Sequence, residues 1–344
     1  MIQFQCDYNE GAHPLILDRL VATNMEQTIG YGEDEYCEHA RGLIRKVCQL
    51  DEANVHFLVG GTQTNTTVIA HCLRPYQGVL AASTGHINVH ETGAIEASGH
   101  KVLPLESTDG KINAAQIIKA VESHIYDDSF EHMVQPGMVY ISFPTELGTL
   151  YSKEELTDIY DACTMLHLPL FIDGARLGYG LCSPECDLTI ADLASLCDVF
   201  YIGGTKVGAL FGEAVVITYE NLNINFRYSI KQHGGMLAKG RLLGLQFETL
   251  FTDGLYMKIS KHAINQALRI RKALEEKGYT FFIESSTNQL FPIFPNDVLY
   301  RLNQDFMFCH WTKVDENHTA VRICTSWATK AENVDRLIEA LQTL

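Results

Sequence analysis

The stretch that decides the fold reads Phe171-Ile172-Asp173-Gly174-Ala175-Arg176, a short apolar run that stops at a carboxylate and a glycine. Continuous apolar character without alternation is typical of a strand covered on both faces, as in a parallel sheet between helices. Similar runs recur along the first two thirds of the chain. The predicted strands are Val55–Val59, Val79–Ser83, Lys101–Leu105, Met138–Phe143, Pro169–Asp173, Val199–Ile202 and Ala214–Thr218.

Amphipathic stretches between these runs predict an α/β fold with a mostly parallel, seven-stranded sheet. Glu154–Leu166 and Ala191–Leu196 are expected to be crossover helices, the first opened by a capping box of Ser152 and Glu155. We predict a large domain over residues 1–247 and a small C-terminal α/β domain over residues 248–344, joined by helical residues 236–275. The small domain is expected to hold strands at Tyr279–Ile283, Gln289–Ile293, Phe306–His310 and Thr319–Cys324, and helices at Asp297–Asn303 and from Lys330.

Two polar positions follow predicted strands, and in an open parallel sheet ligands bind beyond the carboxyl ends of the strands. Asp173 ends one strand, and Lys206 follows another within Gly203-Gly204-Thr205-Lys206-Val207-Gly208. A lysine enclosed by glycines and an apolar strand should be desolvated, which favours the neutral amine that forms a Schiff base. An ionised Asp173 can keep a pyridine nitrogen protonated, so that the ring accepts electrons. Taken singly, the aspartate is equally a segment cap and the lysine an ordinary loop residue.

Two further segments follow strands. Gly60-Gly61-Thr62-Gln63-Thr64-Asn65 is predicted to be a phosphate-binding turn before a helix at Thr66–Leu73, although a Gly-Gly turn is often structural. It is not a P-loop, because Gly-Lys-Ser/Thr is absent. His86 can lie on a planar cofactor and exchange protons near neutral pH. His90 lies four residues on, but no carboxylate has the metalloprotease spacing, so we expect no metal.

Composition limits the classes of partner. The chain has 42 Asp and Glu against 26 Lys and Arg, a net charge of −16, which repels nucleic acid and anionic lipid. Its 10 cysteines are scattered, and the Cys182 to Cys186 spacing matches no common zinc framework. No apolar run reaches the ~18 residues of a membrane span, and the first residues lack a signal-peptide pattern. We expect a cytoplasmic protein with no nucleic-acid or membrane partner.

The order of these pieces resembles the aspartate-aminotransferase type of pyridoxal-phosphate fold (fold type I). Across nearly its whole length the chain resembles the threonine aldolase and β-eliminating lyase family. The segments that carry this resemblance are Tyr31-Gly32-Glu33-Asp34, Gly60-Gly61-Thr62-Gln63-Thr64-Asn65, Gly85-His86-Ile87, Phe171-Ile172-Asp173-Gly174-Ala175-Arg176, Gly204-Thr205-Lys206 and Val321-Arg322-Ile323-Cys324-Thr325-Ser326-Trp327.

The resemblance implies pyridoxal 5′-phosphate as cofactor and an amino acid as substrate. It makes Lys206 the Schiff-base lysine, Asp173 the partner of the pyridine nitrogen and His86 the ring-stacking residue. The other implied roles are phosphate binding at Gly60, Gly61 and Thr62, cofactor and substrate contacts at Arg176, and substrate contacts at Arg322, Glu146 and Tyr31. It also implies a homodimer or homotetramer with active sites between subunits.

Two departures from the family pattern bear on the substrate. Gln5 stands where many members carry an arginine before a serine-aspartate pair, so one carboxylate anchor is replaced. Phe143-Pro144-Thr145-Glu146 stands where members carry an asparagine-threonine-histidine segment, so no second active-site histidine is visible. Glu146 is the candidate to take over part of that histidine's proton handling.

The expected reaction is cleavage of L-threonine, L-allo-threonine or a related β-hydroxy amino acid to glycine and an aldehyde. The alternatives within the same cofactor class are β-elimination and a phenylserine-type aldolase. A dinucleotide oxidoreductase is disfavoured because Gly-x-Gly-x-x-Gly is absent. A non-catalytic scaffold is disfavoured by the retained lysine, aspartate and histidine.

Overall fold

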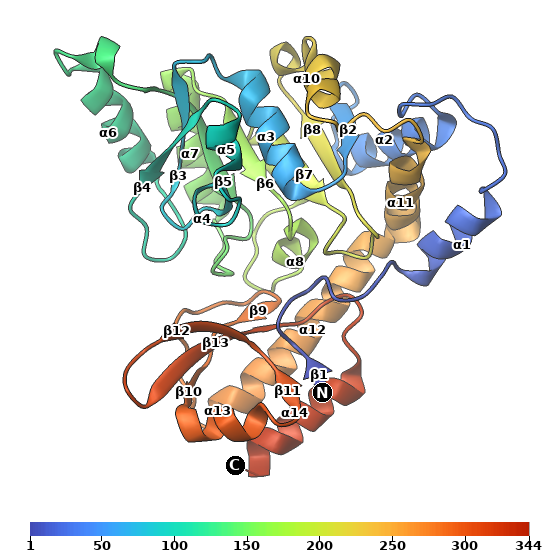
Figure 1. The fold of residues 1–344 in the computed structure, drawn as a ribbon, viewed down its shortest axis with the longest axis vertical. Coiled ribbons are helices and arrows are strands. Elements are labelled where there is room, and N and C mark those ends of the chain that lie inside the picture. The colour runs from blue at the N-terminus through green and yellow to red at the C-terminus, as the bar shows by residue number, and fades with distance from the viewer. Residues whose placement is uncertain (344) are drawn as a thin grey trace.

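The central feature of the computed structural model, which describes residues 1–343, is a seven-stranded sheet (Figure 1). Its order is β2-β8-β7-β6-β5-β3-β4. All seven strands expected from the apolar runs are confirmed. Their bounds are β2 Asn54–Leu58, β3 Gln77–Ala82, β4 Lys101–Leu105, β5 Gln135–Ser142, β6 Leu170–Asp173, β7 Val199–Gly203 and β8 Glu213–Ile217.

The sheet is mostly parallel, as predicted, and β8 is the exception. β4, β3, β5, β6 and β7 pair in parallel, whereas β8 pairs antiparallel with both β7 and β2. The carboxyl ends of the other strands therefore share one edge with the amino end of β8. That edge places Asp173, the residues after β7 and Glu213 beside one another.

Helices cover both faces of the sheet. One face packs against α2 (Glu35–Cys48), α7 (Lys153–Leu166), α9 (Ile190–Ser195) and α11 (Arg241–Phe251). The other packs against α3 (Gly61–Cys72), α4 (His86–Val89), α5 (Ala94–Ala97) and α10 (Phe226–Gln232). The crossover helices α7 and α9 are confirmed, and the predicted capping box of Ser152 and Glu155 is present. α6 (Ala114–Ile125) packs against α7 and β5, and α1 (Pro14–Ala22) packs against α11.

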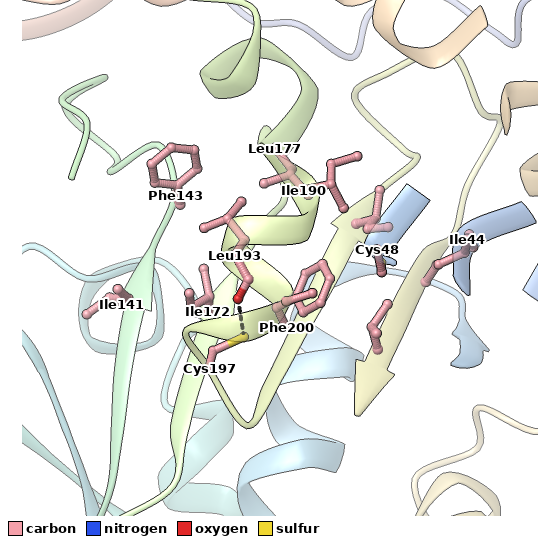
Figure 2. Packing of buried hydrophobic residues seen from close by; sticks show 14 of the residues in the cluster. Ile44, Cys48, Ile141, Phe143, Ile172, Leu177, Ile190, Leu193, Cys197 and Phe200 are labelled. Atoms are coloured by element: carbon pink, nitrogen blue, oxygen red, sulfur yellow. Dashed lines mark hydrogen bonds between the residues drawn. The ribbon is translucent and has the colours of Figure 1, made fainter. Parts of the chain in front are cut away.

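Figure 2 shows the first of these layers from close by. Ile172 and Phe200, from adjacent strands, lie beside Leu193 of α9, and Ile141 of the next strand belongs to the same buried cluster. The Cys197 thiol donates to the Leu193 carbonyl at 3.1 Å. Burying one such apolar side chain contributes about 1.5–3 kcal/mol. This packing gives the sheet edge a rigid support.

A smaller region follows α11 and contains both chain termini (Figure 1). α12 (Leu255–Glu276) leads into it and packs against α14 (Ala331–Thr343). The remaining elements are β9 Gln289–Leu290, β10 Ile293–Pro295, α13 Asn296–Leu302, β11 Phe306–Met307, β12 Cys309–Lys313 and β13 His318–Cys324. β1 (Ile2–Gln3), which sequence reasoning missed, pairs in parallel with β11 and brings the N-terminal segment to this region. The boundary expected near residue 247 stays a prediction.

The predicted strand Tyr279–Ile283 is wrong. The segment forms only an isolated bridge between Phe281 and Pro292. Proline has no backbone N–H, so the ladder cannot continue through Pro292. The same proline lies between β9 and β10, which divide the run expected at Gln289–Ile293. Phe308 similarly separates β11 from β12 within the expected Phe306–His310 strand.

Among residues 1–343, no helix is both long enough and apolar enough to cross a membrane. Over the same residues, no group of three or more His, Cys, Asp or Glu is placed to hold a metal ion.

Candidate active site

A cavity of about 340 Å³ opens at the shared strand edge. It brings together the predicted residues Gly60, Gly61, Thr62, His86, Glu146, Asp173, Arg176 and Lys206. The sequence-based candidates for the cofactor therefore converge on one place. The other lining residues are Tyr8, Val59, Ser142, Pro144, Ala175, Tyr201, Thr205, Phe211 and Glu213.

Asp173 lies at the end of β6, and its carboxylate accepts four hydrogen bonds. It accepts hydrogen bonds from Tyr140, Tyr201 and Asn65 side chains and from the Ala175 N–H at 2.9 Å. Burial alone would raise its pKa, but the nearby His86 charge and these donors outweigh burial and lower the pKa. Asp173 is therefore held as a buried anion, which is the state required to pair with a protonated ring nitrogen.

Lys206 lies in the tight connection between β7 and β8. The glycines before it are required by close approach, because a Cβ at Gly203 would lie 2.3 Å from the Ala175 carbonyl oxygen. Burial and then the Arg176 charge lower the pKa of Lys206, while Asp7, Asp173 and Glu213 oppose this shift. The environment thus favours the neutral, nucleophilic amine.

The predicted phosphate turn is the first turn of a helix. α3 begins at Gly61, so the expectation that helix starts at Thr66 is wrong. Gly60 is its N-cap and has no capping side chain, which leaves the first backbone N–H groups directed at the cavity. Such a helix start attracts phosphate through its free donors and its dipole. The sequence hid this start because glycine and threonine are weak helix formers.

His86 opens α4 and is tied to a second buried acid. Its Nδ1 lies 2.8 Å from Glu91 Oε1, and the same oxygen accepts from Asn65 Nδ2. Burial acts against the imidazolium, but the Glu91 bond and the charge of Asp173 raise the His86 pKa. The chain Glu91, Asn65 and Asp173 therefore links the His86 ring to the floor of the cavity.

Glu146 also faces the cavity. Its Oε1 accepts from Ser142 Oγ at 2.6 Å and from the His86 backbone N–H at 2.9 Å. Burial raises the pKa of Glu146 in spite of these donors. A partly buried carboxyl with a raised pKa, facing the cavity, is suited to exchanging a proton with a ligand.

The two predicted arginines differ in their partners. Arg176 is paired with Asp7, Nε to Oδ2 at 2.7 Å and Nη2 to Oδ1 at 3.0 Å. Arg322, on β13, makes only long contacts, Nη1 to Gln289 Oε1 at 3.4 Å and Nη2 to the Gln5 carbonyl at 3.3 Å. Its buried Nε has no partner within residues 1–343. Arg322 does not line this cavity. Burial raises the pKa of Tyr8, which does line the cavity, and the Arg322 charge acts against this shift.

Tyr31 lies outside the cavity of the single chain. Its backbone is left-handed at φ 63°, and its half-exposed ring lies under the Lys231 ammonium at 5.2 Å. The structure of one chain therefore brings Tyr31 to a different surface, and its substrate contact stays a prediction.

Several site residues were not found from the sequence. Tyr140 and Tyr201 read as ordinary apolar strand residues, and Asp7 lies far along the chain from Arg176, which it bonds. Glu91 lies only five residues after His86 but was not singled out. Glu213 carried a signal, since it opens the otherwise apolar run Glu213–Ile217. A charge at the start of a buried strand requires a partner or a function.

Comparison with known proteins agrees with this geometry. A family model described as Beta-eliminating lyase matches residues 8–295. The low specificity L-threonine aldolase of Pseudomonas aeruginosa is 27% identical over 97% of this chain and 95% of its own length. A solved structure of Leishmania major threonine aldolase is 45% identical, has a TM-score of 0.97 and covers 100% of this chain and 99% of that one.

A more distant structure shows the fold alone. Aspartate aminotransferase from Thermus thermophilus, a double mutant, is 12% identical with a TM-score of 0.71 and covers 100% of this chain and 92% of that one. The fold predicted from the order of cradle, histidine, aspartate and lysine is confirmed by this likeness.

Proposed function

Since this chain belongs to the β-eliminating lyase family, we propose that it is a pyridoxal 5′-phosphate-dependent aldolase for threonine-type substrates. Its reaction would cleave L-threonine, L-allo-threonine or a related β-hydroxy amino acid to glycine and an aldehyde. The observation that carries this proposal is one cavity that holds the buried anion Asp173, the desolvated Lys206 and an uncapped helix start. The name of the Leishmania major relative, a threonine aldolase, supports the substrate class.

The cavity residues fit pyridoxal 5′-phosphate. Gly60, Gly61 and Thr62 offer free N–H groups for a phosphate, and Asp173 is an ionised partner for a pyridine nitrogen. A Cβ at Gly61 would lie 3.2 Å from the Tyr201 hydroxyl, so glycine keeps the cradle open. Lys206 would bind the aldehyde group of the cofactor covalently. When bound, this cofactor supplies an electron sink for the carbanion that forms as the Cα–Cβ bond breaks.

Arg322 is the proposed anchor of the substrate carboxylate. Its only hydrogen bonds are long and go to uncharged oxygens, so its guanidinium keeps capacity for an anion. A guanidinium fork binds a carboxylate in two places and fixes the direction of the bond to be broken. Gln5 contributes only its backbone carbonyl to Arg322 and no positive charge.

Glu146 and His86 are the proposed proton-handling residues. Aldol cleavage requires a base for the β-hydroxyl proton and an acid that later protonates Cα to give glycine. Glu146 is partly buried, lines the cavity and has a raised pKa, and its carboxyl accepts from the His86 backbone N–H. Both side chains therefore belong to one cavity, where we propose that they take over the work of the absent second histidine.

The alternative within the family is β-elimination, in which the β-substituent leaves and ammonia with an oxo acid is formed. The description of the matching family favours keeping it as a second candidate. A phenylserine-type aldolase differs only in the aldehyde released. A product assay decides between them: with L-threonine and L-allo-threonine, we expect glycine and acetaldehyde. Ammonia and an oxo acid as the main products would contradict the aldolase proposal.

We also propose that the chain works as a homodimer or a homotetramer of dimers. α1 and the segment after it expose apolar side chains in succession, and such patches mark association sites. Tyr31 lies at the end of this surface, so a second copy is the route by which it would reach a cavity. The exposed residues are Leu15, Leu17, Val21, Met25 and Ile29. Sedimentation of the wild type and of Val21→Asp tests this, and a monomeric wild type would contradict it. A cytoplasmic location stays a prediction.

A further inference from the structure

Glu213 is a buried acid at the centre of the proposed cofactor site, with no role in the function proposed above. It is the first residue of β8 and only 3% exposed. In the sheet register it lies opposite Leu58 of β2 on one side and Gly203 of β7 on the other. β2 leads into the Gly60 cradle and β7 leads into Lys206. Glu213 therefore lies between the strand ends that carry these two parts of the site.

The Glu213 carboxyl joins the lysine connection to the sheet. Its Oε1 accepts from Thr205 Oγ1 at 2.8 Å, and its Oε2 accepts from the Gly204 N–H at 3.2 Å. Thr205 Oγ1 in turn accepts from the Gly212 N–H at 3.0 Å. The two residues directly before Lys206 are thus both bonded to one carboxyl. Without that carboxyl, the two residues before Lys206 would lose these hydrogen bonds to the sheet.

The charge environment of Glu213 is coupled to that of Lys206. Both donors to Glu213 are uncharged, and burial raises its pKa to about 8, while the Lys206 charge acts in the opposite direction. In the reverse sense, Glu213 is one of the acids that oppose the lowering of the Lys206 pKa by burial and Arg176. Each group therefore changes the proton affinity of the other.

We propose that Glu213 is a positioning residue that holds the Lys206 connection in place between β7 and β8. When ionised, its carboxylate also favours the protonated form of the Lys206 amine. Burial and Arg176 lower the pKa of Lys206, and Glu213 acts against this lowering. This inference rests on the proposed role of Lys206 as the cofactor lysine.

The test is the pH dependence of Lys206 acylation in cofactor-free protein, measured with limiting acetic anhydride and peptide mapping. Only the neutral amine reacts, so the midpoint reports the proton affinity of Lys206. Glu213→Gln keeps the size and removes the charge. An opposite charge favours a protonated amine, so we expect the midpoint of the variant to fall by ~1 pH unit.

Glu146→Gln is the matched control. It removes another carboxyl that lines the same cavity, but one that bonds Ser142 and His86 rather than the lysine connection. Its Lys206 midpoint should equal that of the wild type. An unchanged midpoint in Glu213→Gln, or an equal fall in Glu146→Gln, would overturn the proposal.

Two further measurements keep the test decisive. If Glu213→Gln does not fold, the wild-type curve alone is informative, because ionisation of Glu213 over the same range should spread the Lys206 titration beyond that of one isolated group. A curve with the slope of a single group would contradict the coupling. Separately, borohydride reduction of the wild type with added pyridoxal phosphate identifies the cofactor lysine. A label elsewhere rejects the proposed function, whereas a label on Lys206 with unchanged midpoints rejects the Glu213 inference alone.

Discussion

Two arginines of the candidate site show how its two halves differ. Arg176 belongs to the half built on the large sheet, and Asp7 occupies it with two short bonds. Arg322 belongs to the smaller region, where its guanidinium bonds two neutral oxygens at 3.3 and 3.4 Å and lies over the Trp311 ring at 5.8 Å. Asp173 and Glu146, both in the half built on the large sheet, also differ, since Asp173 accepts from four donors and Glu146 accepts through Oε1 from two.

This difference separates groups that fix the shape of the site from groups that can bind the substrate. A buried charge that is fully paired fixes the shape of a site, because removing its partner leaves an uncompensated charge. A charged group with weak neutral partners keeps its capacity for a ligand. We therefore expect the half around Arg176 and Asp173 to be rigid before any ligand arrives, and the half around Arg322 to be completed by the substrate.

The largest expected effect concerns the Asp7–Arg176 ion pair in the half of the site built on the large sheet. Asp7→Asn should lower the free energy of unfolding by about 3–5 kcal/mol, because it leaves the Arg176 guanidinium buried without a counter-charge. Chemical denaturation of the cofactor-free protein measures this. Cys6→Ser, next to Asp7 but outside the ion pair, should cost little.

The same ion pair predicts a pH dependence. Burial opposes ionisation of Asp7, but Arg176 and Lys206 hold its pKa below the ordinary value. A carboxyl with a lowered folded-state pKa contributes stability above its unfolded pKa and loses it as the pH falls through the folded one. The stability gap between wild type and Asp7→Asn should therefore narrow in acid. A constant gap down to strongly acidic pH would contradict the pairing.

Asp173→Asn tests the role of the Asp173 carboxylate in catalysis. A neutral amide stabilises a pyridinium poorly, so we expect kcat to fall on the order of a hundredfold, equivalent to about 2.7 kcal/mol. Circular dichroism should show a retained fold. Asp198→Asn, a carboxylate bonded to the Leu170 N–H away from the cavity, serves as the control. Turnover of Asp173→Asn close to that of the wild type would remove Asp173 from the proposed site.

Arg322→Lys tests the half of the site around Arg322, which we expect the substrate to complete. Lysine keeps the charge but loses the planar fork, so the dissociation constant for glycine should rise roughly tenfold or more, with cofactor binding unchanged. Gln5→Ala should have little effect, because Gln5 contributes only its backbone carbonyl. Spectroscopic titration with glycine measures both. Equal affinity in wild type and Arg322→Lys would place the substrate carboxylate elsewhere, with Arg176 as the next candidate.

Glu146→Gln should give the smallest change, about a tenfold loss, because His86 remains to share proton transfer. Burial raises the pKa of Glu146, so its basic form accumulates only as the pH rises through that raised value. The wild-type profile of kcat/KM should therefore contain a rising limb that Glu146→Gln lacks. A profile with the same shape in both proteins would contradict a proton-handling role.

Local sequence patterns predicted the sheet well and the smaller region less well. Runs such as Phe171-Ile172-Asp173 are apolar on both faces because helices cover them, and this signal needs no knowledge of partners. In the smaller region, Tyr279–Ile283 has strand composition, but its pairing fails at Pro292, which lies outside the segment. Strand formation depends on the partner as much as on the run itself.

The residues of the candidate site were also predicted only in part from local sequence patterns. Lys206, Asp173 and His86 were visible because each follows a predicted strand, whereas Asp7 acts through Arg176, 169 positions away, and Tyr201 through Asp173, 28 positions away. Only the fold brings such pairs together. The start of α3 at Gly61 was missed because tertiary packing outweighs the weak helix propensity of glycine and threonine.

The most direct test of the central claim is the identity of the lysine that binds the cofactor. Protein prepared with pyridoxal 5′-phosphate should be yellow, and borohydride reduction followed by peptide mapping should place the pyridoxyl group on Lys206, the desolvated lysine between β7 and β8. Lys206→Ala should take up no covalent label. A pyridoxyl group on any other lysine, or none in wild-type protein supplied with the cofactor, would contradict the claim that this cavity is the active site.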